Sequence, residues 1–226
     1  MQTPAEKYLI DTIKKSLNQN YELFSDKAKL INIGGGRSTV IEDNLINGVF
    51  QFISDRVDVE DIKFNNSFVG NFFRCSVEFM PHVKSGEYDV AFANYVLEHV
   101  RDINMAASEI LRILKPGGIF VTSIPNPQAP EFVVSRLTPL WFHKIIRKRE
   151  SWETYYSYES VKQLSKIFNK AGFEMIDVLY WSFSYGYLNR FPVINRISCV
   201  YDKLMDFLKL KHFMNNVCIV LKKPLK

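Results

Sequence analysis

The fold of this chain is decided by a stretch that reads Leu30-Ile31-Asn32-Ile33-Gly34-Gly35-Gly36-Arg37-Ser38, in which an apolar strand runs into three consecutive glycines. Glycine has no Cβ, so it lets the backbone approach a ligand closely and take up positive φ. At the carboxyl end of a first parallel strand, such a turn is typical of a nucleotide-like cofactor site. The stretch therefore predicts a cofactor-binding α/β domain and leaves the cofactor to be identified.

On either side of this turn, strand-like apolar runs alternate with amphipathic helical runs. Helices are expected around residues 9–17 and over 38–46, 102–114 and 158–171. Strands are expected over 29–33, within 50–59, around 71–77, and over 88–93, 119–124, 173–181 and 216–222. Strands that alternate with helices of this length predict a mostly parallel sheet with helices on both faces.

The chain is expected to be a single domain, because 226 residues with 47% hydrophobic composition can build one proper core. Within it we expect an N-terminal helix that caps or lids the core, over 1–27, and a cofactor-binding core over 28–125. A proline-rich stretch over 126–158 reads as an insertion on the acceptor side. Residues 159–226 complete the sheet and include a second acceptor-side segment, through Lys211, that mixes apolar and basic residues.

Charge and cysteine content narrow the class of partner. The net charge of +5 is mildly basic and mostly scattered, and the densest basic run, 143–149, reads as a solvated helix face or as a contact for phosphate or lipid headgroups. Cys75, Cys199 and Cys218 are far apart and form no spacing typical of a metal site, so no metal is expected. With no signal peptide or membrane span visible, a cytoplasmic protein is the expectation.

Two longer motifs carry a resemblance. The first reads Asp89-Val90-Ala91-Phe92-Ala93-Asn94-Tyr95-Val96-Leu97-Glu98-His99-Val100, and the second reads Glu109-Ile110-Leu111-Arg112-Ile113-Leu114-Lys115-Pro116-Gly117-Gly118. Together with the glycines, in this order and spacing, they resemble the small-molecule branch of the class I S-adenosylmethionine-dependent methyltransferases. The resemblance covers about Leu30–Asn126 well and the remainder loosely. It implies a Rossmann-like, seven-stranded sheet with a final antiparallel strand.

The resemblance also implies a cofactor site for S-adenosylmethionine, which leaves the enzyme as S-adenosylhomocysteine. It places the glycine turn beside the methionine portion, and an acidic residue at the end of the second strand on the ribose hydroxyls, with Asp58 the first choice and Asp55 the second. A polar group and a backbone amide near the adenine correspond to Ser76 and Val77, and Asn94 is expected near the amino-acid end. The cofactor-binding residues implied are Asn32, Gly34, Gly35, Gly36, Ser38, Asp55, Asp58, Ser76, Val77 and Asn94.

Three positions test the choice of cofactor. A dinucleotide fingerprint counted from Gly34 would need its third glycine at Thr39, where a β-branched residue hinders close helix–strand packing. Asn32 stands where this family often has an acidic residue, and Ser38 stands where glycine is frequent. Asn still forms hydrogen bonds and Ser begins helices well, so these departures alter cofactor affinity without abolishing binding.

Acceptor chemistry is less strongly marked. Methyl transfer to a hydroxyl benefits from a general base, for which the candidates are His99 and His143; each is equally compatible with a packed or surface residue. Aromatic residues after the fifth strand suggest a pocket wall or the core of a lid. The substrate-binding candidates are Asn126, Trp152, Tyr155 and Tyr156.

The leading hypothesis is O-methylation of a small molecule or of a carbohydrate such as a surface-polysaccharide precursor. The alternatives are a methyltransferase-like binding subunit without turnover and a nicotinamide-dependent oxidoreductase. Nucleic acid is not expected as a partner. The tetrapeptide after the fourth strand reads Asn94-Tyr95-Val96-Leu97 and is not of the D/N-P-P-Y/F type that would indicate nucleic-acid methylation, and no basic-aromatic channel is evident. The segment from Tyr187 to Lys211 could cover the acceptor, form a dimer contact or touch a lipid surface.

Overall fold

A computed structural model describes residues 2–20, 27–46, 51–130, 132–133, 154–155, 157–188 and 192–225. Its centre is a seven-stranded sheet with the order β3-β2-β1-β4-β5-β7-β6. The strands are β1 (Ala28–Ile33), β2 (Phe52–Asp58), β3 (Val69–Arg74), β4 (Tyr88–Asn94), β5 (Leu114–Pro125), β6 (Glu174–Trp181) and β7 (Asn216–Lys222). Only β7 runs antiparallel to its neighbours within this sheet, which confirms the expected fold class.

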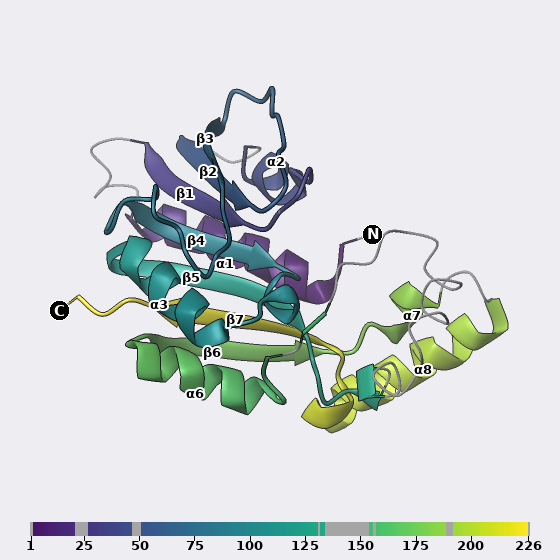
Figure 1. The fold of residues 1–226 in the computed structure, drawn as a ribbon. Helices are drawn as coiled ribbons and strands as arrows, with labels where there is room; N and C mark the ends of the chain where they lie inside the picture. The colour runs from purple at the N-terminus through teal and green to yellow at the C-terminus, as the bar shows by residue number, and fades with distance from the viewer. Residues whose placement is uncertain are drawn as a thin grey trace.

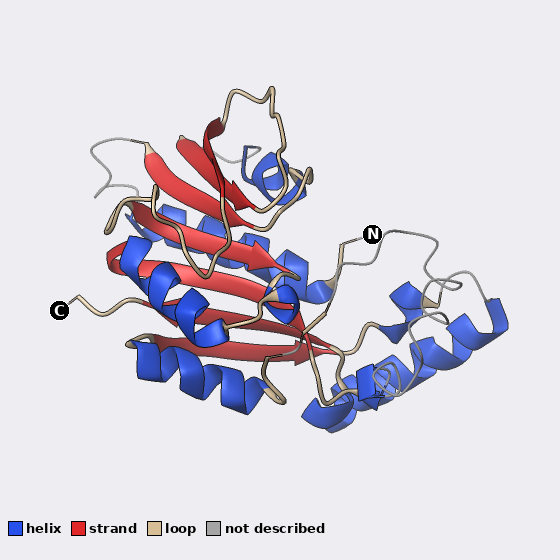
Figure 2. Ribbon diagram, viewed as in Figure 1, coloured by secondary structure: helices blue, strands red, loops and turns tan. Residues whose placement is uncertain are grey.

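Helices cover both faces of the sheet (Figures 1 and 2). The longer ones are α1 (Pro4–Asn20), α2 (Val40–Ile46), α3 (Ile103–Ile113), α6 (Val161–Ala171) and α8 (Pro192–Leu208). Short helical turns are η1 (Leu97–His99), α7 (Ser184–Tyr187) and η2 (Lys211–Phe213). Successive side chains of a strand point to opposite faces. Accordingly, Leu30 packs with α1 and α2, while Ile31 and Ile33 pack with α3 and α6.

The N-terminal helix α1 is part of the core. Its apolar positions Leu9, Ile13 and Leu17 are buried against one face of the sheet, together with Val121 and Val220. Figure 1 shows this helix lying along the sheet on the face opposite α3 and α6. Helix α1 therefore stabilises the sheet over much of its length.

Local signals set the ends of α3 and α6. The carboxylate of Asp102 accepts hydrogen bonds from the backbone N–H groups of Asn104 and Met105, so this residue caps α3. Ser160 caps α6 in the same way, and Gly172 ends α6 in the left-handed region with φ of 113°. The structure thus begins both helices slightly later than the sequence analysis expected.

Strand β5 begins at Leu114, whereas the sequence predicted a strand from Ile119. The Lys115–Gly118 segment ends α3 as expected, but Leu114 before it already pairs with Tyr88 of β4, and regular pairing resumes at Ile119 opposite Val90. The pairing register shifts between Tyr88 and Val90, and an irregularity of this kind accommodates proline and glycine inside a strand.

Candidate active site

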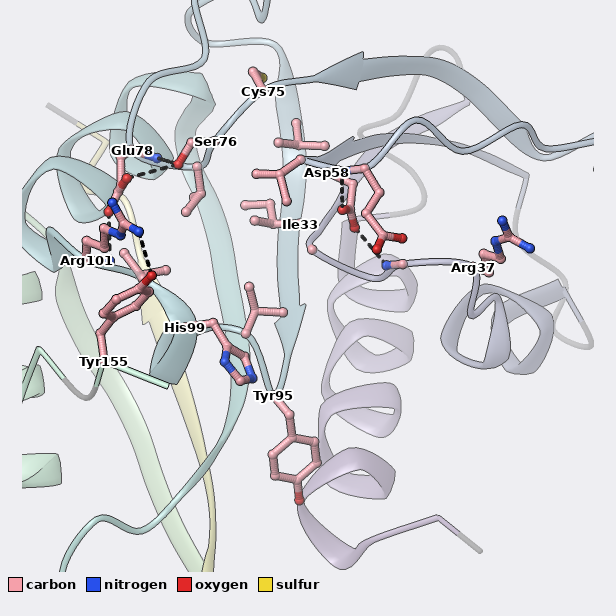
Figure 3. Close-up of a pocket in the computed structure, with 18 residues that line it drawn as sticks. Ile33, Arg37, Asp58, Cys75, Ser76, Glu78, Tyr95, His99, Arg101 and Tyr155 are labelled. Atoms are coloured by element: carbon pink, nitrogen blue, oxygen red, sulfur yellow. Dashed lines mark hydrogen bonds between the residues drawn. The ribbon is translucent and has the colours of Figure 1, made fainter. Parts of the chain in front are cut away.

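A pocket of about 680 Å³ opens where β1, β2 and β4 end at their carboxyl termini. Its size lies within the range of small-molecule sites, about 300–1,000 Å³. Figure 3 shows the side chains around it, with Asp58 near the glycine turn and an Arg101–Tyr155 pair on the other side. The pocket is lined by Ile33, Gly34, Gly36, Arg37, Val57, Asp58, Val59, Glu60, Cys75, Ser76, Val77, Glu78, Tyr95, Val96, His99, Val100, Arg101 and Tyr155.

The glycine turn is fixed by close packing on two sides. Gly34 has φ of 67°, and a Cβ built on it would lie 2.5 Å from Cγ1 of Val96, the second residue after β4. A Cβ on Gly35 would lie 2.5 Å from Oδ1 of Asn32. Side chains at these two positions would therefore push the turn away from Val96 and from Asn32 of β1.

Beneath the turn lies a buried ion pair. Nη1 of Arg56 on β2 lies 2.8 Å from Oε1 of Glu42 on α2, and their side chains are 2% and 0% exposed. Nη2 of Arg56 donates to the carbonyl of Ser38 at 2.6 Å, so the guanidinium holds the backbone just after the glycines. Burial lowers the pKa of Arg56, and the nearby carboxylate of Glu42 opposes that shift.

The same network explains the residue at position 32. Nδ2 of Asn32 donates to Oε1 of Glu42 at 2.8 Å, and Ser54 also donates to that oxygen. The acidic group in this part of the fold is thus supplied by α2, and Asn32 is a donor to it. We name the set Asn32, Glu42 and Arg56 the glycine-loop brace.

Asp58 ends β2 and its carboxylate faces the pocket (Figure 3). Oδ2 accepts the backbone N–H of Gly36 at 2.9 Å, and Oδ1 accepts the backbone N–H of Glu60 at 3.1 Å. A carboxylate has about four acceptor positions, so each oxygen keeps capacity for a further donor. The arrangement presents an oriented acceptor beside the glycine turn.

The segment after β3 forms the next wall. Ser76 accepts the backbone N–H of Glu78, and Oε1 of Glu78 accepts the backbone N–H groups of Arg101 and Asp102 at 2.8 and 2.6 Å. Glu78 therefore ties this wall to the turn that precedes α3. Burial raises the pKa of the neighbouring Cys75 thiol, which disfavours the nucleophilic thiolate.

Opposite the glycine turn, η1 and the segment around residue 155 contribute polar and aromatic groups. His99 is the last residue of η1, a short helical turn between β4 and α3, and it lines the pocket. Nη2 of Arg101 donates to the Tyr155 hydroxyl at 2.7 Å, and the guanidinium carbon lies 4.7 Å from the ring centroid of Tyr155. The backbone N–H of Tyr155 donates to the carbonyl of Glu98.

The structure brings seven of the sequence-predicted residues into this one pocket. They are Gly34, Gly36, Asp58, Ser76, Val77, His99 and Tyr155. Gly35, Asn32 and Ser38 are not among the residues that line the pocket, and each lies against or within the brace. His143, Trp152 and Tyr156 lie outside the described residues.

The remaining predicted residues are held elsewhere. The carboxylate of Asp55 accepts the Tyr88 hydroxyl and the backbone N–H of Asn71, away from the pocket lining. Asn94 donates to Glu6 of α1. Asn126 is buried and donates to the carbonyls of 211 and 214, which fastens the end of β5 to the segment before β7.

Sequence reasoning missed Tyr95, which follows β4 and lines the pocket with φ of 56°. A left-handed conformation is unfavourable for a tyrosine and occurs most often at functional sites. Its hydroxyl forms hydrogen bonds with Thr3 and Asn216, so it links the start of α1 to β7 at the pocket edge. No residue pattern signals this conformation. Arg37 was missed although it follows the glycines directly, and Glu78 and Arg101 were missed because both lie outside the two longer motifs.

Within the described ranges, no cluster of His, Cys, Asp and Glu could hold a metal ion. Among the helices described here, none has the length and apolar character needed to cross a bilayer.

Comparisons with known proteins concern both the family of the chain and its fold. Residues 6–178 match the family model of the methyltransferase domain, and a search of curated proteins found no match. The fold resembles that of a candidate sarcosine dimethylglycine methyltransferase from Galdieria sulphuraria, with a TM-score of 0.64 and 13% identity over 98% of this chain and 86% of that chain.

Two further solved structures share the fold. An S-adenosylmethionine-dependent methyltransferase from Mesorhizobium loti has a TM-score of 0.57 and 13% identity, over 95% of this chain and 100% of that one. Phosphoethanolamine N-methyltransferase 2 from Haemonchus contortus, solved with phosphomonomethylethanolamine and S-adenosylhomocysteine, has a TM-score of 0.53 and 15% identity. That match covers 95% of this chain and 57% of the other.

Proposed function

This chain belongs to the methyltransferase domain family and is an S-adenosylmethionine-dependent methyltransferase, and on that premise we propose that it methylates a hydroxyl oxygen of a small molecule or carbohydrate. The observation that carries the proposal is the pocket that joins Asp58 and the glycine turn on one side to His99 and Tyr155 on the other. Asp58 and the glycine turn fit the cofactor, and His99 and Tyr155 fit an acceptor.

The cofactor half is assigned to the carboxyl ends of β1, β2 and β3. The backbone of Gly34 and Gly36 would lie beside the methionine portion, and the carboxylate of Asp58 would accept the ribose hydroxyls. Ser76 and Val77 would border the adenine, since they follow β3 in the same pocket. The fit is supported by a pocket with apolar walls and an oriented carboxylate, which suits a nucleoside bearing vicinal hydroxyls.

Between the two acidic candidates, the contacts favour Asp58. Asp55 is 5% exposed and already binds a hydroxyl and a backbone N–H group within the sheet. Asp58 instead lines the pocket and keeps acceptor capacity on both oxygens. We therefore assign the ribose to Asp58 and a structural role to Asp55.

The acceptor half is assigned to His99 and Tyr155. When bound, S-adenosylmethionine supplies an electrophilic methyl group on its sulfonium, so the protein's task is to align the acceptor oxygen and remove its proton. An imidazole nitrogen of His99 would accept that proton, and Tyr155, held by Arg101, would orient the acceptor. An imidazole in the pocket favours a hydroxyl acceptor, because a carboxylate acceptor needs no base.

Cofactor binding is tested by thermal unfolding with S-adenosylhomocysteine and, in parallel, NAD. Ligand at 100 times its Kd should stabilise the native state by about 2.7 kcal/mol. Asp58→Ala should remove most of this stabilisation, whereas Asp61→Ala, which removes an exposed carboxylate three residues away, should leave it intact. An undiminished shift in Asp58→Ala would show that the ribose assignment is wrong.

The base is tested with a panel of phenols, monosaccharides and primary amines and a radiolabelled methyl donor. His99→Gln should lower kcat/KM for the best acceptor by about 10²–10⁴-fold and leave S-adenosylhomocysteine binding unchanged. His82→Gln, at an exposed histidine outside the pocket lining, is the matched control. Equal activity of His99→Gln and wild type would exclude His99 as the base, and methylation of amines alone would contradict the proposed acceptor class.

A further inference from the structure

Helix α8 is attached to the protein through its polar side. Asp202 accepts the backbone N–H of Tyr185, and Asp206 accepts that of Ser182, both at 2.9 Å. Nδ2 of Asn195 donates to the Tyr185 carbonyl at 2.6 Å. A helix on the surface of a globular protein normally turns its apolar side inward, so this attachment is the reverse of the usual one.

The outward side of α8 is apolar along its full length. Ile197 is 66% exposed, Val200 68% and Phe207 81%. The exposed positions recur every three or four residues, so they form one continuous face. We call this face the α8 stripe, and it consists of Val193, Ile194, Ile197, Val200, Leu204, Phe207 and Leu208.

The charges of α8 are divided between its two sides. Both acidic residues, Asp202 and Asp206, are engaged with the segment that starts after β6. The basic residues Arg196 and Lys203 are exposed and, at 100° per residue, lie along one border of the stripe. Within α8, all of which the structure describes, no acidic residue lies on that border.

This charge pattern distinguishes two possible occupants of the stripe. If a second copy packed its own stripe here in antiparallel orientation, exposed basic side chains would come together without acidic partners on that border. An anionic surface would instead pair with Arg196 and Lys203, and exposed Lys209 and Lys211 extend the positive charge beyond the helix. Apolar residues bordered by Lys and Arg are the pattern of helices that lie in a membrane interface.

We propose that the α8 stripe docks this protein on an anionic phospholipid bilayer, with α8 parallel to the surface, its apolar residues at the acyl boundary and Arg196 and Lys203 at the lipid phosphates. Exposed Leu210 and Phe213, just after the helix, would extend the contact. Helix α8 connects β6 to β7 and projects beyond the sheet (Figure 1), so no strand has to move for the stripe to reach lipid.

The proposal is independent of the methyl acceptor and can be tested without one. The full chain is sedimented with vesicles of phosphatidylcholine alone or of phosphatidylcholine mixed with phosphatidylglycerol. We expect strong binding to the mixed vesicles, weak binding to the neutral ones, and loss of binding at high salt.

Two variants examine the two parts of the surface. Ile197→Ser/Phe207→Ser should weaken binding to mixed vesicles by more than about tenfold, because two large apolar side chains no longer enter the interface. Ile176→Ser, at a 55% exposed isoleucine of β6, is the matched control and should bind like wild type. Arg196→Gln/Lys203→Gln should weaken binding to mixed vesicles by about tenfold and leave binding to neutral vesicles unchanged.

Thermal unfolding establishes that each variant is folded before binding is compared. The proposal is overturned if folded wild type does not sediment with mixed vesicles, or if Ile197→Ser/Phe207→Ser sediments as well as wild type. It is also overturned if light scattering shows a wild-type dimer that this variant abolishes while vesicle binding is absent, because the stripe would then be the contact between two copies.

Discussion

The glycine-loop brace and helix α8 both turn charged side chains toward the protein, with opposite results. In the brace, Glu42 meets a guanidinium, and the pair holds the backbone that borders the pocket. In α8, Asp202 and Asp206 meet backbone N–H groups, and the apolar residues are left outside. The brace lies inside the core, whereas α8 lies at its margin.

The difference shows what an inward-facing acid can be used for. A buried charge is costly unless it is paired, so the Glu42–Arg56 pair makes the glycine turn depend on both partners. An acid that accepts a backbone N–H near the surface loses less hydration free energy than a fully buried one, and its hydrogen bond only attaches the helix to the neighbouring segment. The first arrangement fixes a site, and the second exposes a surface. Four substitutions test this distinction.

The largest effect is expected at the brace. Glu42→Gln keeps the shape of the side chain but removes the ion-pair partner of the buried Arg56, which should lower the free energy of unfolding by about 4 kcal/mol. Urea denaturation measures the loss. Asp11→Asn, at an exposed acid of α1, should cost about 0.5 kcal/mol or less. Equal stability of the two variants would remove the distinction between the brace and an ordinary surface acid.

A further inward-facing acid, Glu98 of η1, is only 6% exposed. Oε2 of Glu98 forms no hydrogen bond within the described part of the chain, and burial raises the pKa of this carboxyl from 4.5 to about 8. The folded protein therefore holds a proton that the unfolded chain releases between these pH values. Stability should fall as pH rises from 4.5 to about 8.

Glu98→Gln removes this dependence. The variant should match wild type near pH 4.5 and exceed its stability by about 3 kcal/mol at pH 7, from about 1.4 kcal/mol per pH unit. Urea unfolding curves at several pH values give the comparison. A constant difference across the range would mean that Glu98 is charged in the folded protein and has a partner.

A smaller effect is expected where α8 is attached. Asp206→Ala leaves the backbone N–H of Ser182 without its acceptor and should cost about 1.5 kcal/mol. Asp206→Asn retains an oxygen acceptor and should lie close to wild type. If both substitutions cost as much as Glu42→Gln, α8 would be as integral to the fold as the brace is.

The smallest effect is expected on the outward face. Ile197→Ser should change stability by no more than about 0.5 kcal/mol, because an exposed side chain contributes little packing. The same substitution at Ile110 of α3, which is 0% exposed, should cost about 4 kcal/mol. A large loss for Ile197→Ser in thermal unfolding would mean that the stripe is covered in the folded protein.

Most of the fold could be predicted, because its signals are local. The last strand was expected over 216–222 and the structure has β7 there, and Lys115–Gly118 ends α3 as predicted. The early start of β5 could not be predicted, because pairing with Tyr88 overrides the proline and glycines. Helix α8 was missed although its apolar positions have helical spacing, because the sequence analysis left that segment without an element.

The site was predictable to the extent that it follows strand ends. Asp58, Ser76 and His99 each follow or precede a recognisable element, and the structure gathers them around one pocket. The Glu42–Arg56 pair could not be foreseen, because it depends on how closely α2 approaches β2 in space. Tyr95 was missed because a tyrosine in the sequence gives no sign that its backbone will adopt a left-handed conformation.

The antiparallel register of β6 and β7 has a consequence for the history of such a protein. Trp181 lies opposite Asn216, so the two strands could be joined by an ordinary hairpin turn in place of everything between them. Helix α8 therefore occupies a position where a peptide can be inserted or deleted without rearranging any strand. Attachment to a lipid surface is then a trait that a lineage can acquire or discard through one insertion, while the chemistry at the opposite half of the sheet continues unaltered.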